Sequence, residues 1–295
     1  MTRPVVPDAD RLIGVRQPVL LHGFVALVDY MGNDAAIVQA ARVSYGAGTK
    51  TVRDDRGLIR YLMRHRHTTP FEMVEYKFLI RLPIFVARQF IRHRTGSFNE
   101  FSARYSVMTD EFEVPEPQEV RHQSTRNRQG RGDPLPPEAV ERFRSDLERV
   151  SRDAYQAYTR ALNDGVARET ARLLLPVAYY TQWYWKTNLW NLFHFLSLRL
   201  DLHAQEEIRL YAAEIAKVAR VVCPIAFEAF EEFQLSGISL SRREQVAVRA
   251  LLEGQTPENA CARAGLDLVR EDGRPLKTGE GTEFLEKLGQ IRSIE

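Results

Sequence analysis

The sequence predicts an α+β fold, with a mostly antiparallel or mixed sheet flanked by many helices rather than a Rossmann arrangement. Helical patterns outnumber strand patterns along the 295 residues, and the strand patterns do not alternate with helices as βαβ units require. The glycine fingerprint G-x-G-x-x-G of dinucleotide-binding folds is also missing from the sequence. Any nucleotide that binds this chain must therefore be held by side chains.

The composition is that of an ordinary globular protein. Hydrophobic residues make up 44% and charged residues 27% of the chain, and the formal net charge of +2 is too balanced to require a nucleic-acid partner. The two cysteines, Cys223 and Cys261, are too few for a disulfide framework or a four-thiolate zinc site. No segment has the apolar length of a signal peptide core or a membrane span. We therefore expect a cytoplasmic protein without a membrane partner.

The first third of the chain combines two strands with short helices. Residues 20–30 predict a strand, and residues 74–82 predict the clearest one, because apolar and polar side chains alternate along them. Between these strands, residues 34–44 and 54–66 have the apolar spacing of amphipathic helices. Pro83 is expected to open a further helix, since proline is favoured in a first turn.

The remainder of the chain is mainly helical. Residues 108–137 are rich in Glu, Pro, Arg, Gln and Gly and predict a long loop, which we expect to be an insertion. Residues 177–187 are aromatic and β-prone and predict a strand. Helices are predicted over residues 137–163, 168–175, 188–200, 204–221, 225–233, 242–252 and 283–291. Because the composition becomes more polar at Gly237, we expect one domain over residues 1–236 and a polar helical extension over residues 237–295.

The segment RHRTGSFNEFSARY, residues 92–105, is the most informative part of the sequence. It places ten polar or ionisable residues among fourteen, directly after the apolar run PIFVARQFI. Arg92 and Arg94 supply guanidinium groups that can each donate two hydrogen bonds to a phosphate. His93 between them adds a donor whose charge depends on pH. The hydroxyl, amide and carboxylate groups that follow suit a pyrimidine edge and a ribose. An anionic ligand is therefore the first inference, and a solvated basic helix end is the alternative for the three basic residues alone.

Arginines on later helices are further candidates. Arg168 and Arg172 lie one helical turn apart and share a face, where Glu169 could pair with one of them. Arg199 ends an apolar helix, and an arginine in that setting either has a partner or meets an anion. A buried ion pair with Asp201 is the alternative to an anion at Arg199.

The histidines and cysteines do not predict a metal site or a nucleophile. His65 and His67 could begin a metal site, but no carboxylate–histidine set near them completes it. Cys223 precedes a proline at a helix start, and Cys261 lies in the polar tail without a close histidine. We therefore expect no metal and assign both cysteines to structure.

The polar segment resembles the motif R-H-R-x-x-S-x-N-E-x-S-x-R of flavin-dependent thymidylate synthases, the ThyX family, which fixes eight residue identities. Flanking segments agree, namely HTTPFE, PIFVARQF, ARLLLP, LSLRLDLHAQEEI and CPIAFEAF. The resemblance runs from about residue 20 to residue 235 and does not cover residues 108–137 or the tail. It implies the α+β fold of the thymidylate-synthase-complementing type.

The resemblance also implies an activity and a set of ligands. The activity is reductive methylation of deoxyuridine monophosphate (dUMP) to thymidylate (dTMP). FAD would mediate the redox chemistry, 5,10-methylenetetrahydrofolate would supply the carbon, and NADPH would supply the reducing equivalents. Family members are homotetramers whose active sites draw residues from several subunits, so the site segments need not meet within one chain.

The resemblance assigns residues by position. The expected FAD contacts are His67, Thr69, Arg92, His93, Arg94, Glu100, Asn188, Leu189, Trp190 and His194. The family often has asparagine where His194 stands. The expected dUMP contacts are Gln89, Phe90, Ile91, Arg92, Glu100, Phe101, Ser102, Ala103, Arg104, Arg172 and Arg199. We expect Arg199 to be the catalytic residue, because a cation at the end of an apolar helix can stabilise negative charge that develops on uracil. Ser102 is expected to position the substrate, since the sequence shows no base to activate it.

Two other functions and an inactive protein remain as alternatives. Residues 92–104 and the basic segment 121–133 could form a nucleic-acid surface, although Glu100 would oppose phosphates. A metal-dependent nucleotide phosphohydrolase could use the set His65, His67, Asp201 and His203. A chain could also keep this fold and motif without turnover.

Overall fold

The sheet of this protein is antiparallel throughout, as a computed structural model shows for residues 5–43, 55–124, 130–270 and 272–293. Its five strands follow the order β1-β2-β3-β7-β4. They are β1 (Arg16–Val19), β2 (Gly23–Met31), β3 (Glu75–Pro83), β7 (Tyr180–Asn188) and β4 (Ser97–Glu100). The predicted α+β class with an antiparallel sheet is confirmed, and the arrangement is not that of a Rossmann fold.

One face of the central strands is buried in the core. On β3, the alternating residues Tyr76, Phe78, Ile80 and Leu82 have no exposed surface. The register pairs Phe78 with Trp185 of β7 and Ile80 with Trp183, so alternate β7 residues share this face. The predicted period of two along residues 74–82 is confirmed and explains why this strand is central.

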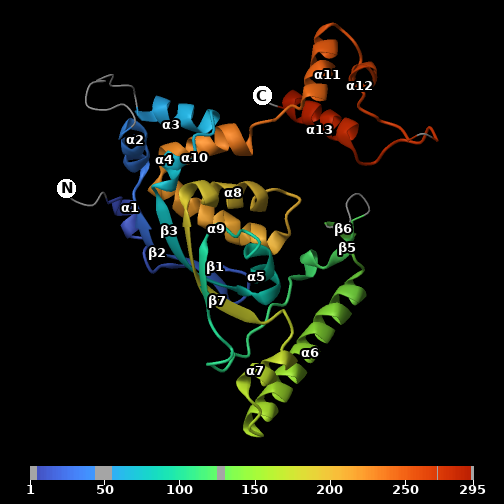
Figure 1. Ribbon diagram of the computed structural model, residues 1–295. Helices are drawn as coiled ribbons and strands as arrows, with labels where there is room; N and C mark the ends of the chain where they lie inside the picture. Colours follow the sequence, from blue (N-terminus) through green and yellow to red (C-terminus); the bar gives the residue numbers. More distant parts are fainter. Residues whose placement is uncertain (1–4, 44–54, 125–129, 271, 294–295) are drawn as a thin grey trace. The chain divides into compact units, whose positions relative to one another are not determined.

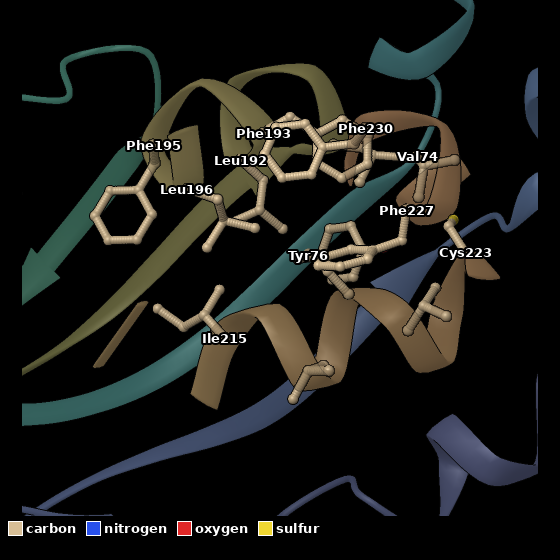
Figure 2. Close-up of a cluster of buried hydrophobic side chains, with 14 of the residues drawn as sticks. Val74, Tyr76, Leu192, Phe193, Phe195, Leu196, Ile215, Cys223, Phe227 and Phe230 are labelled. Carbon is tan, nitrogen blue, oxygen red and sulfur yellow. The ribbon is translucent and has the colours of Figure 1, made fainter. Parts of the chain in front are cut away.

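Two helices cover the sheet, and a third packs beside them to complete the core. They are α8 (Leu189–Arg199), α9 (Glu206–Val222) and α10 (Pro224–Phe230), and α8 and α9 lie side by side against the strands (Figure 1). Figure 2 shows Phe193 of α8 lying against Phe230 of α10, with ring centroids 4.3 Å apart and planes 7° from parallel. Asp34 fixes the start of α10, because its carboxylate accepts hydrogen bonds from the backbone of Ile225 and Ala226, each at 2.9 Å.

The helices of the first third begin and end close to their predicted limits. They are α2 (Asp34–Val43) and α3 (Asp55–Arg64); the predicted end at Ser44 and start at Asp54 lie outside the described residues. Helix α3 ends two residues before the predicted Arg66, which has a left-handed φ of 55°. His67 N donates to Leu62 O at 2.9 Å across this residue, the geometry of a Schellman ending.

Several short elements were not predicted. They are α1 (Pro7–Asp10), β1, α4 (Thr69–Glu72) and β4. Pro83 is the last residue of β3 rather than the first of a helix, and α5 (Ile84–Phe90) begins one residue later. Within the polar segment, β4 pairs with β7 at the edge of the sheet, with Glu100 opposite Trp183.

The expectation of a structureless loop over residues 108–137 is wrong in part. The segment contains η2 (Pro117–Glu119) and a two-stranded ladder of β5 (Arg121–Gln123) and β6 (Arg131–Pro134). Arg131 of β6 donates to Glu206 at 3.1 Å and also to the buried Glu207 at the start of α9. These long-range ion pairs hold a ladder that has no local apolar pattern.

The later helices follow the predictions with small shifts at their ends. Helix α6 (Pro137–Asn163) has the predicted limits. The predicted helix 168–175 is split into α7 (Arg168–Ala171) and the 3-10 turn η3 (Arg172–Leu174). The predicted helix 225–233 begins at Pro224 and continues beyond Phe230 as the π-helical turn η4 (Glu231–Leu235).

The chain divides into two compact units, Met1–Leu235 and Ser236–Glu295. The second unit contains α11 (Arg242–Leu252), α12 (Pro257–Ala264) and α13 (Glu280–Arg292), and α12 was not predicted. Its own apolar core includes Ala247, Cys261 and Phe284, each with no exposed surface. Among the helices that the structure describes, none combines the length and the apolar character that a bilayer crossing demands.

Candidate active site

The polar motif leaves the core at the end of α5. Phe90 is fully buried, with its ring centroid 4.5 Å from that of Phe195, whereas Ile91 is 48% exposed. Arg92 and Arg94 are exposed, and His93 between them is partly buried. The backbone N of His93 donates to Phe90 O at 3.0 Å, which turns the chain out of the helix. The apolar run PIFVARQFI thus anchors the motif, as the sequence predicted.

Gly96 allows the motif to run close against β7. A Cβ atom at this position would lie 2.6 Å from Trp185 Nε1 and 3.0 Å from Lys186 O. Thr187 of β7 donates its hydroxyl hydrogen to Thr95 O at 3.4 Å on the same stretch. The glycine is therefore required for close approach of two backbones rather than for an unusual φ angle.

After β4, the chain lines a cavity of about 320 Å³, which we call the β4–α7 cavity. Glu100 lies at one side, and its carboxylate accepts a hydrogen bond from Thr181 Oγ1 at 2.6 Å. The cavity is lined by Ile84, Glu100, Phe101, Ser102, Ala103, Met108, Arg172, Leu175 and Thr181. Five of these residues belong to the dUMP set of the sequence analysis: Glu100, Phe101, Ser102, Ala103 and Arg172.

Arginines gather beside this cavity around the carboxylate of Glu169. Arg104 Nε donates to Glu169 Oε2 at 3.1 Å, and Arg172 Nε donates to the backbone oxygen of Glu169 at 3.3 Å. Arg168 donates to the backbone oxygen of Tyr105 at 2.7 Å. The suggested pairing of Glu169 with an arginine occurs, but its ion-pair partner is Arg104 rather than a residue of its own helix. One carboxylate among three arginines leaves an excess of positive charge beside Arg172, which lines the cavity.

Arg199 and Gln89 lie elsewhere in the chain. Arg199 lines a separate cavity of about 290 Å³ with Ser197, Leu198, Asp201, His203 and Ala204, which we call the Arg199 cavity. Gln89 of α5 donates to the side-chain oxygen of Gln205, just before α9. Within one chain, therefore, the expected dUMP residues do not all line one cavity: five line the β4–α7 cavity, and Arg199 lines the Arg199 cavity.

The alternative of an ion pair between Arg199 and Asp201 is not what the structure shows. Arg199 Nε donates to His93 Nε2 at 2.9 Å, whereas Asp201 Oδ1 lies 2.8 Å from His203 Nδ1. Burial lowers the pKa of Arg199, although a guanidinium group stays protonated in proteins. Burial, together with the positive charge of Arg199 and the neighbouring His194, lowers the pKa of His93 to about 4. His93 is therefore neutral at pH 7.

The start of α8 carries another part of the FAD set. Asn188 is the N-cap, and its side-chain oxygen accepts a hydrogen bond from Asn191 N at 2.9 Å. The Trp190 ring lies 5.9 Å from that of Phe71 in α4, and the His194 ring lies 6.0 Å from that of His93. Leu189 is fully buried, so its side chain belongs to the core.

His67 and Thr69 line a cavity of about 940 Å³, which we call the α3–α4 cavity. Most of its lining is apolar, and it includes Leu58, Tyr61 and Met73. Tyr61 packs between two histidines, with ring centroids 4.3 Å from His65 and 6.0 Å from His67. A cavity of this size is within the range of ligand and cofactor sites.

The titratable residues do not gather as the metal-dependent alternative requires. Among the described residues, no group of three or more His, Cys, Asp or Glu side chains is placed to hold a metal ion. His65 and His67 contact Tyr61, whereas Asp201 and His203 pair with each other in the Arg199 cavity. Cys223 and Cys261 are free and fully buried, and burial raises the pKa of both thiols.

The sequence did not single out some residues that this geometry brings to the site. Thr181 is 5% exposed and holds Glu100 from the neighbouring strand. Its signal was a hydroxyl residue at an inward position between two buried aromatic residues, Tyr180 and Trp183. The sequence around Gln205 and Gly96 does not indicate their roles. Gln205 accepts a hydrogen bond from the distant Gln89, and Gly96 lies close to Trp185 of β7.

Comparisons with known proteins agree with this geometry. The family model Thy1, described as thymidylate synthase complementing protein, matches residues 26–225. The flavin-dependent thymidylate synthase of Rickettsia bellii (strain RML369-C) is 49% identical over 266 residues, which cover 86% of this chain and 90% of the relative. The enzyme of the same name from Ruegeria pomeroyi is 47% identical over 292 residues, which cover 98% of this chain and 93% of the relative.

A solved structure supports the fold as well. The UMP/dUMP methylase PolB of Streptomyces cacaoi, bound with 5-Br dUMP, is 38% identical and has a TM-score of 0.67. The match covers 74% of this chain and 99% of that one. The resemblance predicted from the polar motif is confirmed, and this chain belongs to the family of flavin-dependent thymidylate synthases.

Proposed function

We propose that this protein catalyses the reductive methylation of dUMP to dTMP, with FAD as redox mediator, 5,10-methylenetetrahydrofolate as carbon donor and NADPH as reductant. The β4–α7 cavity carries this proposal. Its lining combines a carboxylate, a serine hydroxyl and an arginine, and Arg104 follows directly after Ala103 of the lining. Family membership supplies the reaction class, and the relatives are named for flavin dependence and thymidylate synthesis.

The chemistry of the cavity suits a mononucleotide. Its volume of about 320 Å³ lies at the small end of the range for ligand sites. Arg172 and Arg104 offer planar forks for phosphate oxygens, and a phosphate would compete with Glu169 for Arg104. Ser102 and Glu100 offer polar groups to sugar or base, and Glu100 is held in place by Thr181.

The residues expected at FAD also fit that cofactor. The α3–α4 cavity is large and mostly apolar, and His67 and Thr69 add polar groups to its lining. Arg92 and Arg94 are exposed cations that suit a pyrophosphate. When bound, the flavin supplies electron transfer between the reductant and the pyrimidine. The protein residues bind and orient the two ligands.

Arg199 is the residue to which we assign a catalytic role. Carbon C5 of uracil is a poor nucleophile until negative charge develops over N3 and its carbonyl groups. A partly buried guanidinium group at that position would stabilise this charge more than water does. The cysteines offer no alternative nucleophile, because both are fully buried with raised pKa values.

We also propose that the active enzyme is a homotetramer with shared active sites. The β4–α7, Arg199 and α3–α4 cavities share no lining residue within one chain. An assembly in which one subunit places its Arg199 surface beside the β4–α7 cavity of another would reunite the dUMP set. The free thiols fit a reducing compartment such as the cytoplasm.

The test is a methyl-transfer assay on the purified protein. It would measure conversion of dUMP to dTMP with FAD, methylenetetrahydrofolate and NADPH, and again with each of the three omitted. UMP would be assayed in parallel, because the structural relative is described as a UMP/dUMP methylase. We expect dTMP in the complete mixture and none without folate. Absence of dTMP from the complete mixture, with flavin bound, would contradict the proposal.

A further inference from the structure

We propose that His93 is a positioning residue that orients the guanidinium group of Arg199 through an uncharged hydrogen-bond acceptor. The inference rests on the proposed function, because it assigns His93 a task in a site that handles dUMP. The juxtaposition is between the third residue after α5, which lies in the polar motif, and the last residue of α8. The resemblance places His93 at FAD and does not by itself assign it to Arg199.

The contact joins Arg199 to a histidine that is itself held from other directions. Arg199 Nε donates to His93 Nε2 at 2.9 Å. The ring of His93 lies edge-on against Phe195, with centroids 4.9 Å apart and planes 76° from parallel. Its backbone N is bonded to Phe90 O at 3.0 Å, so both main chain and ring are fixed. A ring held in this way can set the direction of the guanidinium plane.

The protonation state of His93 follows from this contact. Since Nε2 accepts the hydrogen bond, the neutral ring must carry its hydrogen on Nδ1. Burial, with Arg199 and His194 nearby, holds the pKa of His93 at about 4, so this acceptor persists at pH 7. The Nδ1–H group remains as a donor, and it is the group that His93 can offer to a ligand.

Because the acceptor His93 is neutral, Arg199 keeps its positive charge in the site. A carboxylate bonded to Arg199 would orient the guanidinium group but would also cancel its positive charge. The nearest acidic residue along the chain, Asp201, is instead bonded to His203, both through the backbone N at 2.7 Å and through the ring at 2.8 Å. Arg199 thus has its Nε fixed and keeps its full charge, with the Nη groups left as donors for a ligand.

Two substitutions separate the positioning role from other roles of His93. His93→Gln can place an acceptor near the position of Nε2, whereas His93→Asn reaches only as far as Nδ1 and loses that acceptor. For each variant, FAD affinity, dUMP affinity of the FAD-loaded protein, kcat and KM would be measured. We expect His93→Gln to stay within about threefold of the wild type in dUMP affinity and kcat. We expect His93→Asn to lose about ten- to a hundredfold in both quantities, the effect of losing one hydrogen bond to a charged group.

A double-mutant cycle with Arg199→Ala shows whether the effect passes through Arg199. In that background, His93→Gln and His93→Asn should bind dUMP equally, because the side chain that they position is missing. Any loss of FAD affinity, in contrast, should be the same with and without Arg199. Equal impairment by Gln and Asn in the wild-type background, or full additivity with Arg199→Ala, would overturn the positioning role. A wild-type protein that binds FAD but neither binds nor methylates dUMP would instead overturn the proposed function.

Discussion

Thr181 joins the central part of the sheet to the motif through a single hydroxyl group. It is 5% exposed on β7 and donates to Glu100 at 2.6 Å beside the β4–α7 cavity. Thr181→Val keeps the shape of the side chain and removes this donor, so Glu100 loses its fixed orientation. We expect dUMP affinity to fall about tenfold in a titration of the FAD-loaded protein. Thr181→Ser keeps the hydroxyl and should restore affinity; equal affinities for Val and wild type would contradict the role of Glu100 in binding.

Gly96 is the residue at which the motif and β7 come closest. The Cβ atom of Gly96→Ala would lie 2.6 Å from Trp185 Nε1, so the ring or the motif must shift. We expect the free energy of unfolding to fall by about 1–3 kcal/mol, measured by urea denaturation, together with weaker FAD binding. Gly57→Ala in α3 is the matched control, because no described atom lies within 4 Å of its Cβ. Alanine at position 96 with unchanged stability and flavin binding would show that this close contact is not required.

The lowered pKa of His93 makes stability depend on pH. An unfolded histidine takes up a proton near pH 6.5, whereas folded His93 does so only near pH 4. The unfolded state therefore binds more protons between these values, and stability should fall as the pH is lowered from about 6.5 to about 4. Urea denaturation at several pH values should show a smaller slope for His93→Gln than for the wild type. Identical slopes would mean that His93 is protonated in the folded protein in this range.

At the scale of elements, Asn188 serves both α8 and the expected flavin site. Its side-chain oxygen accepts from Asn191 N at 2.9 Å and caps the helix. Asn188→Ala should lower the free energy of unfolding by about 1 kcal/mol, whereas Asn188→Asp should keep the cap. Both variants should bind FAD more weakly, since each loses the amide donor. The measurements are urea denaturation and flavin titration; equal stability of the two variants would contradict the capping role.

The sequence predicted long or strongly periodic elements well. Alternation identified β3, and the limits of α6 were correct, because both patterns are local. Strand β4 could not be predicted, since its four residues, three of them polar, pair with β7 far along the chain. Helix α12 was missed although its signals are present: Thr256 caps it, Pro257 opens it, and Gly265 ends it with a left-handed φ of 67°.

In the candidate site, too, the sequence predicted what depends on neighbouring residues and missed contacts between distant ones. The motif led to the β4–α7 cavity because its residues are consecutive and follow an anchored helix. The ion pair with Asp201, which the sequence offered as the alternative to an anion at Arg199, does not occur in the structure. The structure instead pairs Arg199 with His93, which only tertiary packing of α5 against α8 brings near. Contacts of this kind have no signal in a single sequence.

At the scale of the whole molecule, the two compact units have separate cores. The core of Met1–Leu235 and that of Ser236–Glu295 share no residue among those described. We therefore propose that residues 1–235 form the enzyme domain and expect this fragment to fold, bind FAD and respond to dUMP. Circular dichroism and the flavin absorption of the fragment test this expectation. A fragment of residues 1–222 is the control, because it lacks α10, whose Phe227 and Phe230 are buried in the core.

If the shorter fragment unfolds and residues 1–235 do not, the domain boundary is supported. An unfolded or colourless fragment of residues 1–235 would show that the second unit is needed for folding or binding. The match with the relative from Ruegeria pomeroyi covers 98% of this chain, so it extends over the second unit as well.

The most direct test of the central claim is the absorption spectrum of the purified protein, incubated with FAD, before and after addition of dUMP. The motif contains residues assigned to FAD and residues assigned to dUMP. We therefore predict the spectrum of a bound flavin, which shifts when dUMP is added. His93→Asn should retain the flavin and show the shift only at higher dUMP concentration. A protein that stays colourless after incubation with FAD would contradict the account, and the motif would then have to serve another anion.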